Sequence, residues 1–551
     1  MKSIRNIIIT GVTVFLLIIL LQNSTLVFAK TPPKTSSPLS LVYNFKTGIP
    51  AEVTGRGPVT ISKVQKKSSP CVYVSGRTEG WHGIQIELTN KLKVGKEYRI
   101  TLYVLQTEQE SETINASFDI TKVKKRLYPV ISTIDVKKNS WVKINRKVRV
   151  EAYDTIFLYL QTLRNNTTSF YVKNIRIEEV VYHPSEVLSY PSLYQLADKY
   201  NFYLGTVISE DTLSSSPFRQ VVKKHFNSMT AENEMKATRL LDHEKSMINA
   251  KSGNGMPCLD FSKADIIMDF AAANNIRMRG HTLIYQAATP DWFFREGYKS
   301  DSKYVDRSVM LNRMENYIMQ VVTHFEKKYP EVIYAWDVVN EAIGIDIWDT
   351  EPKGDYPISM GLQTDLFYTK IGADYIQKAF EYARKYSSEG VKLFYNDWGC
   401  TDPTKRDAIC YLINMVNKDE KLIDGIGMQC YLEKDSGPLL SYLDKSEASF
   451  VDAVDAFHEL DMEIHLTEVT IKNYSISEYQ TQGAFYSELF KIIKDINKDE
   501  AVITCVSFWS TLDRDQQVGD PGYPEWQHSG LLSIDLQPKP GFIEVYNSLN
   551  K

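Results

Sequence analysis

The sequence lacks the features that mark several large classes of protein. Its 64 Lys and Arg residues nearly balance 68 Asp and Glu residues, for a net charge of −4, and no basic cluster exceeds short runs such as 124–126. Nucleic-acid binding requires a concentrated basic surface, so we expect no DNA or RNA partner. With 43% hydrophobic and 24% charged residues over 551 positions, the chain is also neither disordered, nor collagenous, nor a single coiled coil.

Cysteine is scarce and scattered. No two cysteines form a CxxC pair or follow a zinc-binding spacing, so the spacing identifies neither a disulfide nor a metal site. No calcium-binding loop is recognisable either. We expect no metal and no other cofactor. The six cysteines are Cys71, Cys258, Cys400, Cys410, Cys430 and Cys505.

Long apolar runs are confined to the first thirty residues. Lys2 and Arg5 precede an apolar run over 7–21, and Val27 and Ala29 supply small residues at the −3 and −1 positions of a cleavage site. The run is shorter than the roughly 20 residues that span a bilayer. We therefore predict a signal peptide over 1–29, secretion, and no membrane insertion after cleavage; an uncleaved anchor is the alternative.

Aromatic residues are abundant, with 8 Trp, 33 Tyr and 23 Phe. Such rings form flat amphipathic surfaces that stack on planar ligands and on sugar rings, although most aromatic residues serve in cores. The two halves of the chain use them within different patterns.

Residues 38–181 show an all-β pattern. Short alternating segments are separated by turn-forming residues, and no long helical periodicity intervenes, which is typical of a β-sandwich. The pattern changes around Pro184 and Pro191, and we place a linker at 182–192. The expected strands cover 83–88, 97–105, 113–120, 141–150, 155–160 and 169–177.

Residues 193–551 alternate strand-like runs with helix-length amphipathic segments such as 264–274 and 308–327. Eight such units predict a (β/α)₈ barrel, in which catalytic groups lie at the carboxyl ends of the strands. The fold class is thus α/β, with an all-β sandwich before the barrel. The expected barrel strands cover 203–207, 228–231, 277–282, 333–340, 392–396, 424–429, 463–468 and 502–509.

Two glutamates at the ends of expected strands have the positions that glycosidic bond cleavage needs. Glu341 follows the fourth strand and Glu468 ends the seventh, so they face each other across the barrel mouth. Retaining hydrolysis uses one carboxylic acid to protonate the leaving oxygen and one carboxylate about 5–5.5 Å away as nucleophile. A lone strand-end Glu would more often be a solvated rim residue.

A series of motifs in the barrel region resembles glycoside hydrolase family 10, which contains mainly retaining endo-β-1,4-xylanases on a (β/α)₈ barrel. The pair WDVVNEA and downstream LTE is the most specific part of this resemblance. The motifs are TAENEMK (230–236), RGHTL (279–283), TPDWF (289–293), WDVVNEA (336–342), YNDW (395–398), IDGIGMQ (423–429), LTE (466–468), FW (508–509) and LQPKP (536–540).

The resemblance implies roles for individual residues. Glu341 would be the general acid/base and Glu468 the nucleophile, while Asp337 is interpreted as a hydrogen-bond acceptor rather than a third catalytic acid. Two tryptophans would form the floor and wall of the cleft for the sugars on the non-reducing side. The implied substrate-binding residues are Glu232, Asn233, Lys236, His281, Asn340, Gln429, Tyr431, Trp509 and Trp526.

The sequence departs from the family beside the nucleophile. The family has His where this chain has Tyr431 and Asp where it has Thr470; that pair holds the nucleophile and tunes its charge. A tyrosine hydroxyl still donates to Glu468 and a threonine accepts, so orientation survives without the titratable imidazole. We expect activity with a changed pH profile.

A further departure lies after the third strand, where the family's TLVWHSQ is TLIYQAA here. Tyr285, Gln286 and Ala288 replace Trp, His and Gln. Each lost hydrogen bond is worth roughly 0.5–1.5 kcal/mol. Substrate preference is therefore less firmly indicated than reaction type.

The first domain resembles a family 22 carbohydrate-binding module, through GWHGI (80–84), KVGKEY (93–98) and FYVKNIRI (170–177). The resemblance makes Trp81, Tyr103 and Tyr159 candidates for a xylan-binding cleft; burial of these rings in the sandwich core is equally compatible with the sequence.

These observations predict a secreted retaining endo-β-1,4-xylanase that acts on xylan and xylo-oligosaccharides, with cell-wall association left open. Two alternatives remain. One is a surface polysaccharide-binding protein with little catalysis, although a pure binder needs neither Glu341 nor Glu468. The other is a retaining enzyme with a different β-glycoside substrate, which the altered third-strand loop would permit.

Overall fold

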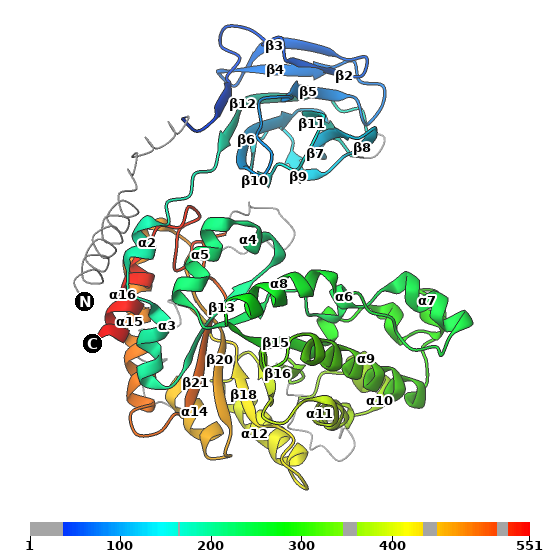
Figure 1. Ribbon diagram of the computed structural model, residues 1–551. Helices are drawn as coiled ribbons and strands as arrows, with labels where there is room; N and C mark the ends of the chain where they lie inside the picture. Colours follow the sequence, from blue (N-terminus) through cyan, green and yellow to red (C-terminus); the bar gives the residue numbers. More distant parts are fainter. Residues whose placement is uncertain (1–36, 164–165, 345–360, 434–448, 515–526) are drawn as a thin grey trace, which may run out of the picture.

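The computed structural model describes residues 37–163, 166–344, 361–433, 449–514 and 527–551 (Figure 1). The predicted signal peptide at 1–29 and the predicted cleft residue Trp526 lie outside the described residues. Within the described ranges, no helix has the length and apolar character needed to cross a membrane.

The first domain is a sandwich of two antiparallel sheets, seen at the top of Figure 1. One sheet has the order β10-β6-β12-β4-β3, with β1 paired to β12, and the other has the order β2-β5-β11-β7-β8, with β9 paired to β7. The strands are β1 (Ser40–Tyr43), β2 (Val53–Arg56), β3 (Thr60–Lys66), β4 (Ser69–Ser75), β5 (Gly83–Glu87), β6 (Glu97–Gln106), β7 (Ser111–Lys122), β8 (Lys125–Leu127), β9 (Val130–Lys137), β10 (Val142–Arg149), β11 (Thr155–Thr162) and β12 (Phe170–Glu179).

The inner faces of the two sheets form one apolar core. Alternate residues of β6, among them Ile100, Leu102 and Val104, are fully buried there, while their neighbours point outward. This period-2 burial is the sequence signal that predicted the strand. The predicted sandwich is confirmed, and all six expected segments are strands. The remaining strands were not predicted; β3 and β4 carry Lys, Ser and Pro, which weaken the alternation.

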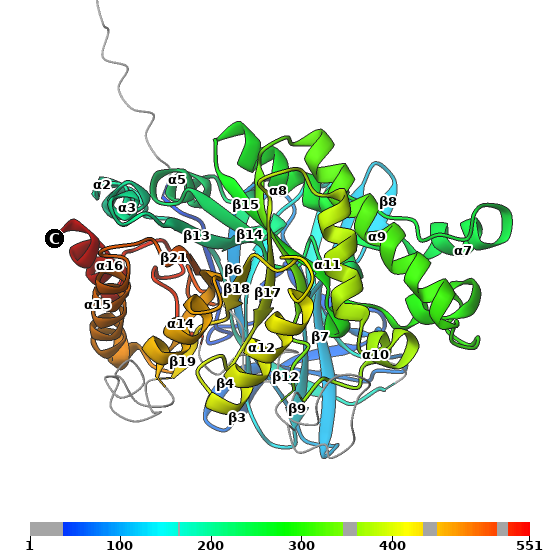
Figure 2. The same ribbon diagram turned by 90° about the horizontal axis from the view of Figure 1, so that it is seen from below.

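The second domain is a closed parallel barrel, as the sequence predicted. Its order is β18-β17-β16-β15-β14-β13-β21-β20, and pairing of β18 with β20 closes the ring. Figure 2 shows helices around these strands. The strands are β13 (Tyr203–Ile208), β14 (Ser228–Ala231), β15 (Arg277–Ile284), β16 (Ile333–Asn340), β17 (Lys392–Asp397), β18 (Gly425–Met428), β20 (Glu463–Lys472) and β21 (Ile503–Phe508), with the short β19 (Tyr431–Glu433) paired to β20.

The helices cover the outside of the barrel. The α-helices are α2 (Ser185–Ser189), α3 (Leu193–Ala197), α4 (Glu210–Ser214), α5 (Ser216–His225), α6 (Ala237–Leu240), α7 (His243–Ser252), α8 (Ser262–Ala273), α9 (Arg307–Lys328), α10 (Leu366–Ile371), α11 (Tyr375–Tyr386), α12 (Pro403–Val416), α14 (Phe450–His458), α15 (Tyr479–Ile496) and α16 (Pro540–Asn550). The 3₁₀ turns are η1 (Asp198–Tyr200), η2 (Gln286–Ala288), η3 (Asp291–Phe294), η4 (Glu296–Tyr298) and η6 (Ile476–Glu478).

The segment between the two domains is partly structured. The sandwich ends with β12, and α2 lies within the segment 182–192 that we expected to be a linker. Val187 of α2 is fully buried in the barrel core. The ordering of α2 follows from that burial, because a helix this short is not stable alone.

Candidate active site

Most predicted site residues of the barrel lie where its strands end. Asn340 is the last residue of β16 and Glu341 follows it, Gln429 follows β18, and Trp509 follows β21. Glu468 lies within β20, which continues to Lys472 instead of ending at the glutamate as predicted. In a parallel barrel the carboxyl ends of all strands meet at one mouth, so closure of the ring brings these side chains together.

A chain of amide hydrogen bonds links the two candidate catalytic glutamates. Gln429 Nε2 donates to Glu341 Oε1 at 2.9 Å and to Asn340 Oδ1 at 3.2 Å. Asn396 Nδ2 donates to the same Asn340 oxygen at 2.8 Å and to Glu468 Oε1 at 3.3 Å. The amide oxygen of Asn340 accepts both of these bonds. Its NH₂ group therefore points away from Gln429 and Asn396 and can donate to a ligand.

The nucleophile candidate is buried, with only 5% of Glu468 exposed. Burial raises the pKa of this carboxyl; His281, the Tyr431 hydroxyl and Lys236 oppose that shift, and Glu341 adds to it. Tyr431 Oη donates to Glu468 Oε2 at 2.6 Å. The tyrosine thus makes the contact that we predicted for it in place of histidine.

Thr470, the second exchanged residue, lies opposite Tyr431 in the β19–β20 pair. Its hydroxyl contacts Ser510 Oγ at 3.2 Å. The hydroxyl groups at the two exchanged positions thus make separate contacts. Tyr431 contacts the nucleophile candidate Glu468, and Thr470 contacts Ser510, which lies just after β21.

The acid/base candidate Glu341 is held from both sides. Tyr285 Oη donates to Glu341 Oε2 at 2.8 Å, while Gln429 binds the other oxygen. Burial raises the pKa of Tyr285, and Glu341 raises it further, so the phenol remains a donor at neutral pH. The backbone of Glu341 has a φ of 56°, in the left-handed region that a non-glycine residue rarely adopts. Its N–H donates to the Asn396 carbonyl at 2.9 Å, which fixes this turn.

A buried ion pair contacts His281 and orients its ring. Arg279 and Asp337, both fully buried, are joined by NH2–Oδ1 and NH1–Oδ2 contacts of 2.5 and 3.1 Å. Asp337 Oδ2 is also 2.8 Å from His281 Nδ1. Burial alone would raise the pKa of Asp337, but Arg279 and His281 hold it below its ordinary value. Asp337 thus acts as the hydrogen-bond acceptor we expected and orients the imidazole.

Lys236 and Trp509 border the catalytic pair. Lys236 Nζ lies 5.8 Å from the centroid of the Trp509 ring, and the His281 ring meets the indole edge to face at 5.6 Å. Burial lowers the pKa of the Lys236 amine, and Glu468 and Glu232 oppose that shift in part. Lys236 Nζ also donates to Asn233 Oδ1 at 3.3 Å. The predicted residues of TAENEMK therefore gather beside the predicted carboxylates.

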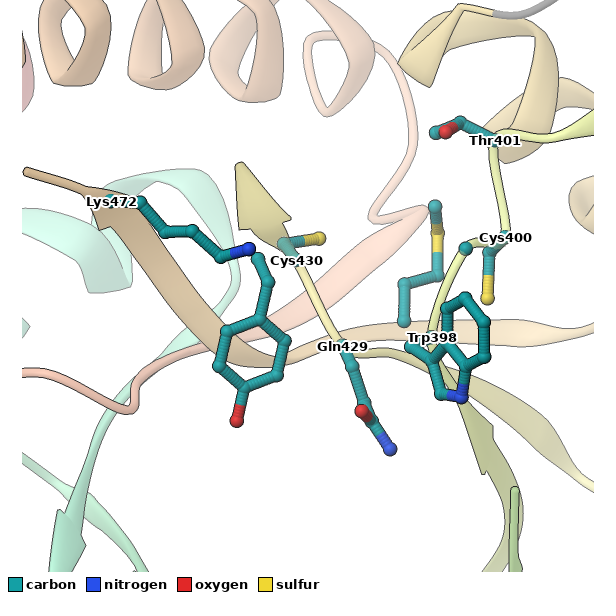
Figure 3. A pocket seen from close by; sticks show the side chains of 9 residues that line it. Trp398, Cys400, Thr401, Gln429, Cys430 and Lys472 are labelled. Carbon is teal, nitrogen blue, oxygen red and sulfur yellow. The ribbon is translucent and has the colours of Figure 1, made fainter. Parts of the chain in front are cut away.

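A cavity of about 400 Å³ opens on the other side of Gln429. Figure 3 shows Gln429 and Cys430 between Lys472 of β20 and Trp398, which follows β17. This volume lies in the range of small-molecule sites. All six cysteines of the chain are free thiols in the structure, and the described ranges contain no cluster of His, Cys, Asp and Glu suited to a metal ion.

Sequence reasoning missed three residues that shape this site. Tyr285 was interpreted only as a lost tryptophan, yet it contacts the acid/base candidate directly. Asn396 ends the expected strand 392–396 but was given no role, and it links Asn340 to Glu468. Arg279 was not considered. The strand-end position of Asn396 was a usable signal, whereas nothing in the sequence indicates where the Tyr285 and Arg279 side chains point.

The sandwich carries a separate cluster of rings around Arg56 of β2. The guanidinium carbon lies 3.8 Å from the Tyr159 centroid and 5.8 Å from both Trp81 and Tyr128. Arg56 also donates to Gln161 Oε1 at 2.6 Å. Trp81 is 49% exposed and Tyr128 48%, while Tyr159 is buried. Trp81 and Tyr159 are thus brought together as predicted candidates, and Tyr128 is an addition that the sequence did not indicate.

Tyr103, the third predicted residue of the sandwich cleft, is not part of this cluster. It lies on β6 in the other sheet, where its neighbours across the ladder are Lys143 and Lys173. Side chains that point outward from opposite sheets of a sandwich face away from each other. Tyr103 and Trp81 therefore cannot line the same cleft.

Two family models match the chain. Residues 192–548 match "Glycosyl hydrolase family 10", and residues 43–167 match "Carbohydrate binding domain". Among curated proteins, endo-1,4-beta-xylanase A of Thermotoga neapolitana is 32% identical over 87% of this chain and 44% of that protein. Exoglucanase XynX of Acetivibrio thermocellus is 28% identical over 86% of this chain and 41% of that protein. The chain spans less than half the length of these relatives.

A solved structure extends the similarity to both domains. It is described as the CBM22-1 and GH10 modules of Clostridium thermocellum endo-1,4-beta-D-xylanase 10B complexed with xylohexaose. It shares 26% identity with this chain, with a TM-score of 0.56, over 90% of this chain and 94% of that one.

Proposed function

Because this chain belongs to glycosyl hydrolase family 10, we propose that it is a retaining endo-β-1,4-xylanase that cleaves internal bonds of xylan and xylo-oligosaccharides. The observation that carries the proposal is the hydrogen-bonded chain from Glu341 through Gln429, Asn340 and Asn396 to Glu468. It holds two carboxyl groups in different surroundings at one barrel mouth, as acid/base and nucleophile chemistry requires.

In the first step Glu341 protonates the glycosidic oxygen and Glu468 attacks the anomeric carbon. The bond to the leaving sugar breaks, and a covalent glycosyl-enzyme forms. The Asn340 NH₂ group donates to the 2-hydroxyl of the sugar being cleaved. His281, whose ring is oriented by Asp337, is proposed to contact the same sugar.

In the second step Glu341, now ionised, takes a proton from water. The water oxygen attacks the anomeric carbon and releases Glu468, so two inversions give net retention. Tyr285 and Gln429 each donate to one oxygen of Glu341 and hold the carboxyl in place during this step. No cofactor takes part in either step.

Glu232, Asn233 and Lys236, with Trp509, are proposed to bind the sugars on the non-reducing side. Trp526 is proposed as the other tryptophan of that cleft on the basis of the family resemblance alone. In the sandwich, the cluster around Arg56 is proposed to bind xylan, because the half-exposed rings of Trp81 and Tyr128 offer apolar faces to sugars, while the buried Tyr159 ring holds the Arg56 guanidinium in place.

The proposal includes secretion, supported by the apolar run at 7–21 and the Val27 and Ala29 site. The domains are proposed as 38–181 for the sandwich and 193–551 for the barrel, joined by 182–192. The relative named exoglucanase favours one alternative, a β-1,4-glucan substrate for the same chemistry.

The test is reducing-sugar release from xylan and from a soluble β-1,4-glucan by the secreted form, with Glu468→Gln as control. We expect xylan hydrolysis that the variant loses by at least about a thousandfold, since an amide is no nucleophile. Faster hydrolysis of the glucan would transfer the proposal to that substrate. Xylan binding without turnover in the unmutated chain would replace the enzyme with a binding protein.

A further inference from the structure

A second set of buried polar residues holds the backbone next to Glu341. The hydroxyl of Tyr395, on β17, accepts hydrogen bonds from the backbone N–H groups of Ala342 and Ile343 at 3.0 and 3.1 Å. Both of these residues are buried, so the two N–H groups depend on this acceptor. The Glu341 N–H donates to the Asn396 carbonyl, and three consecutive N–H groups are thus bound to β17.

The Tyr395 hydroxyl is itself fixed by a buried carboxylate. It donates to Asp397 Oδ2 at 2.5 Å. The other oxygen of Asp397 accepts from Lys405 Nζ of α12 at 2.8 Å and from the Trp398 N–H at 2.8 Å. A tyrosine hydroxyl has one donor and two acceptor positions, and all three are occupied. The hydroxyl therefore cannot turn away from the two N–H groups.

Burial separates this network from the substrate. Tyr395 and Asp397 are fully buried, and Lys405 is 3% exposed. Burial raises the pKa of Asp397 to about 6; Lys405 opposes that shift and Glu341 adds to it, so the carboxyl is ionised at neutral pH. None of the three residues lines the cavity beside Gln429. They can act on the reaction only through the backbone that they hold.

The backbone at Glu341 needs such support. Its φ of 56° lies in the left-handed region, where a non-glycine residue stays only if the surrounding structure holds it. If the turn relaxed, the carboxyl would move relative to the glycosidic oxygen. A displacement of about 1 Å is enough to cost about a hundredfold in rate.

We propose that Tyr395, fixed by Asp397 and Lys405, is the positioning residue of the general acid, because it holds the turn that directs Glu341 at the glycosidic oxygen. The inference rests on the proposed function and deepens it. It assigns the network to the protonation of the leaving group and not to substrate binding or to the nucleophile.

The test compares two substrates that differ in their need for an acid. The sugar that leaves from xylohexaose must be protonated, whereas dinitrophenolate leaves from a dinitrophenyl β-xylobioside without a proton. In Tyr395→Phe we expect kcat/KM on xylohexaose to fall by about tenfold, a part of the roughly 10²–10⁴-fold that acid–base catalysis supplies. On the dinitrophenyl substrate kcat/KM should stay within about twofold.

The ratio of the two kcat/KM values is independent of how much protein folds, because both come from one preparation. Tyr317→Phe is the matched control. Tyr317 of α9 is also a buried tyrosine, but its hydroxyl has no hydrogen-bond partner among the described residues. Removing that hydroxyl should leave the rates on both substrates unchanged.

Lys405→Met extends the test to the far end of the network. It leaves Asp397 buried without its cation, so the hold on Tyr395 should loosen, and we expect the same selective loss at about threefold. Equal losses on both substrates in Tyr395→Phe, or no loss on either, would overturn the inference. An unmutated chain that hydrolyses neither substrate would contradict the proposed function and, with it, this inference.

Discussion

The barrel and the sandwich each gather aromatic and charged side chains at one place, but they bury them to different extents. Around the catalytic pair, Glu468, Asn340 and Gln429 are no more than 5% exposed. In the sandwich cluster, Trp81 and Tyr128 keep almost half of their surface exposed. The barrel groups are joined by a continuous chain of hydrogen bonds, whereas the sandwich rings are joined by their contacts with the Arg56 cation and by the edge-to-face contact of Tyr128 with Tyr159.

The difference indicates what each site can do. A buried network fixes the direction and charge of each carboxyl before substrate arrives, which bond cleavage requires. Half-exposed rings leave their faces available to a polymer, but they supply no acid or base for bond cleavage. The barrel is thus suited to chemistry and the sandwich to attachment, and the following predictions test that division.

The largest effect is expected from breaking the buried Arg279–Asp337 ion pair, which orients His281. Asp337→Ala leaves Arg279 charged and fully buried, so the free energy of unfolding should fall by roughly 3–5 kcal/mol. Chemical denaturation followed by tryptophan fluorescence measures this.

Asp119→Ala in the sandwich is the counterpart. Of its two partners, Arg126 is 62% exposed and can be rehydrated, and Arg56, 12% exposed, keeps its hydrogen bonds to Gln161 and to the Trp81 carbonyl, so the loss should be clearly smaller. Equal losses would contradict the contrast between a buried and an exposed network.

The next effect concerns the nucleophile. Tyr431→Phe removes a hydrogen bond that favours the ionised Glu468, so the pKa of this carboxyl, already raised by burial, should rise further. Glu468 must be ionised to attack. Activity should therefore be lost at a higher pH as the medium is acidified, and the pH profile of kcat/KM should show its acid limb moved upward. An unmoved acid limb would exclude Tyr431 as the residue that tunes the nucleophile.

The sandwich cluster should affect attachment alone. Trp81→Ala should weaken binding to insoluble xylan by about tenfold, because one stacked ring is lost, with hydrolysis of soluble xylobiosides unchanged. Tyr103→Ala, on the other sheet, is the matched control and should bind normally. Depletion assays on washed xylan measure both. Weaker binding by Tyr103→Ala would mean that the xylan-binding surface lies on the sheet that contains β6 and not around Arg56.

The smallest effect is expected at the acid/base. Tyr285→Phe removes a hydrogen bond that orients the Glu341 carboxyl, so kcat/KM on xylan should fall by only about threefold. The acid limb of the pH profile should stay in place, which distinguishes this variant from Tyr431→Phe. A shift of the acid limb alone would mean that the two tyrosines do not serve separate carboxyls.

The fold and much of the site could be predicted from the sequence because both depend on local pattern. The burial of β16 follows its largely apolar run, and closure of the barrel brings Glu341, which follows β16, to the same mouth as Glu468 of β20. The Tyr285 contact depends on how a side chain after β15 crosses to β16, which no periodicity encodes. The placement of Tyr103 failed for a similar reason: alternation shows that a residue points outward but not which sheet it belongs to.

The assignment of Glu341 and Glu468 as acid/base and nucleophile is tested most directly by the anomeric configuration of the first product. Proton NMR of xylohexaose hydrolysis, recorded before mutarotation equilibrates the sugars, resolves the α and β anomeric signals. Double displacement through Glu468 predicts that the β-anomer appears first and the α-anomer grows in only by mutarotation. Initial formation of the α-anomer would show single displacement and contradict the nucleophilic role of Glu468.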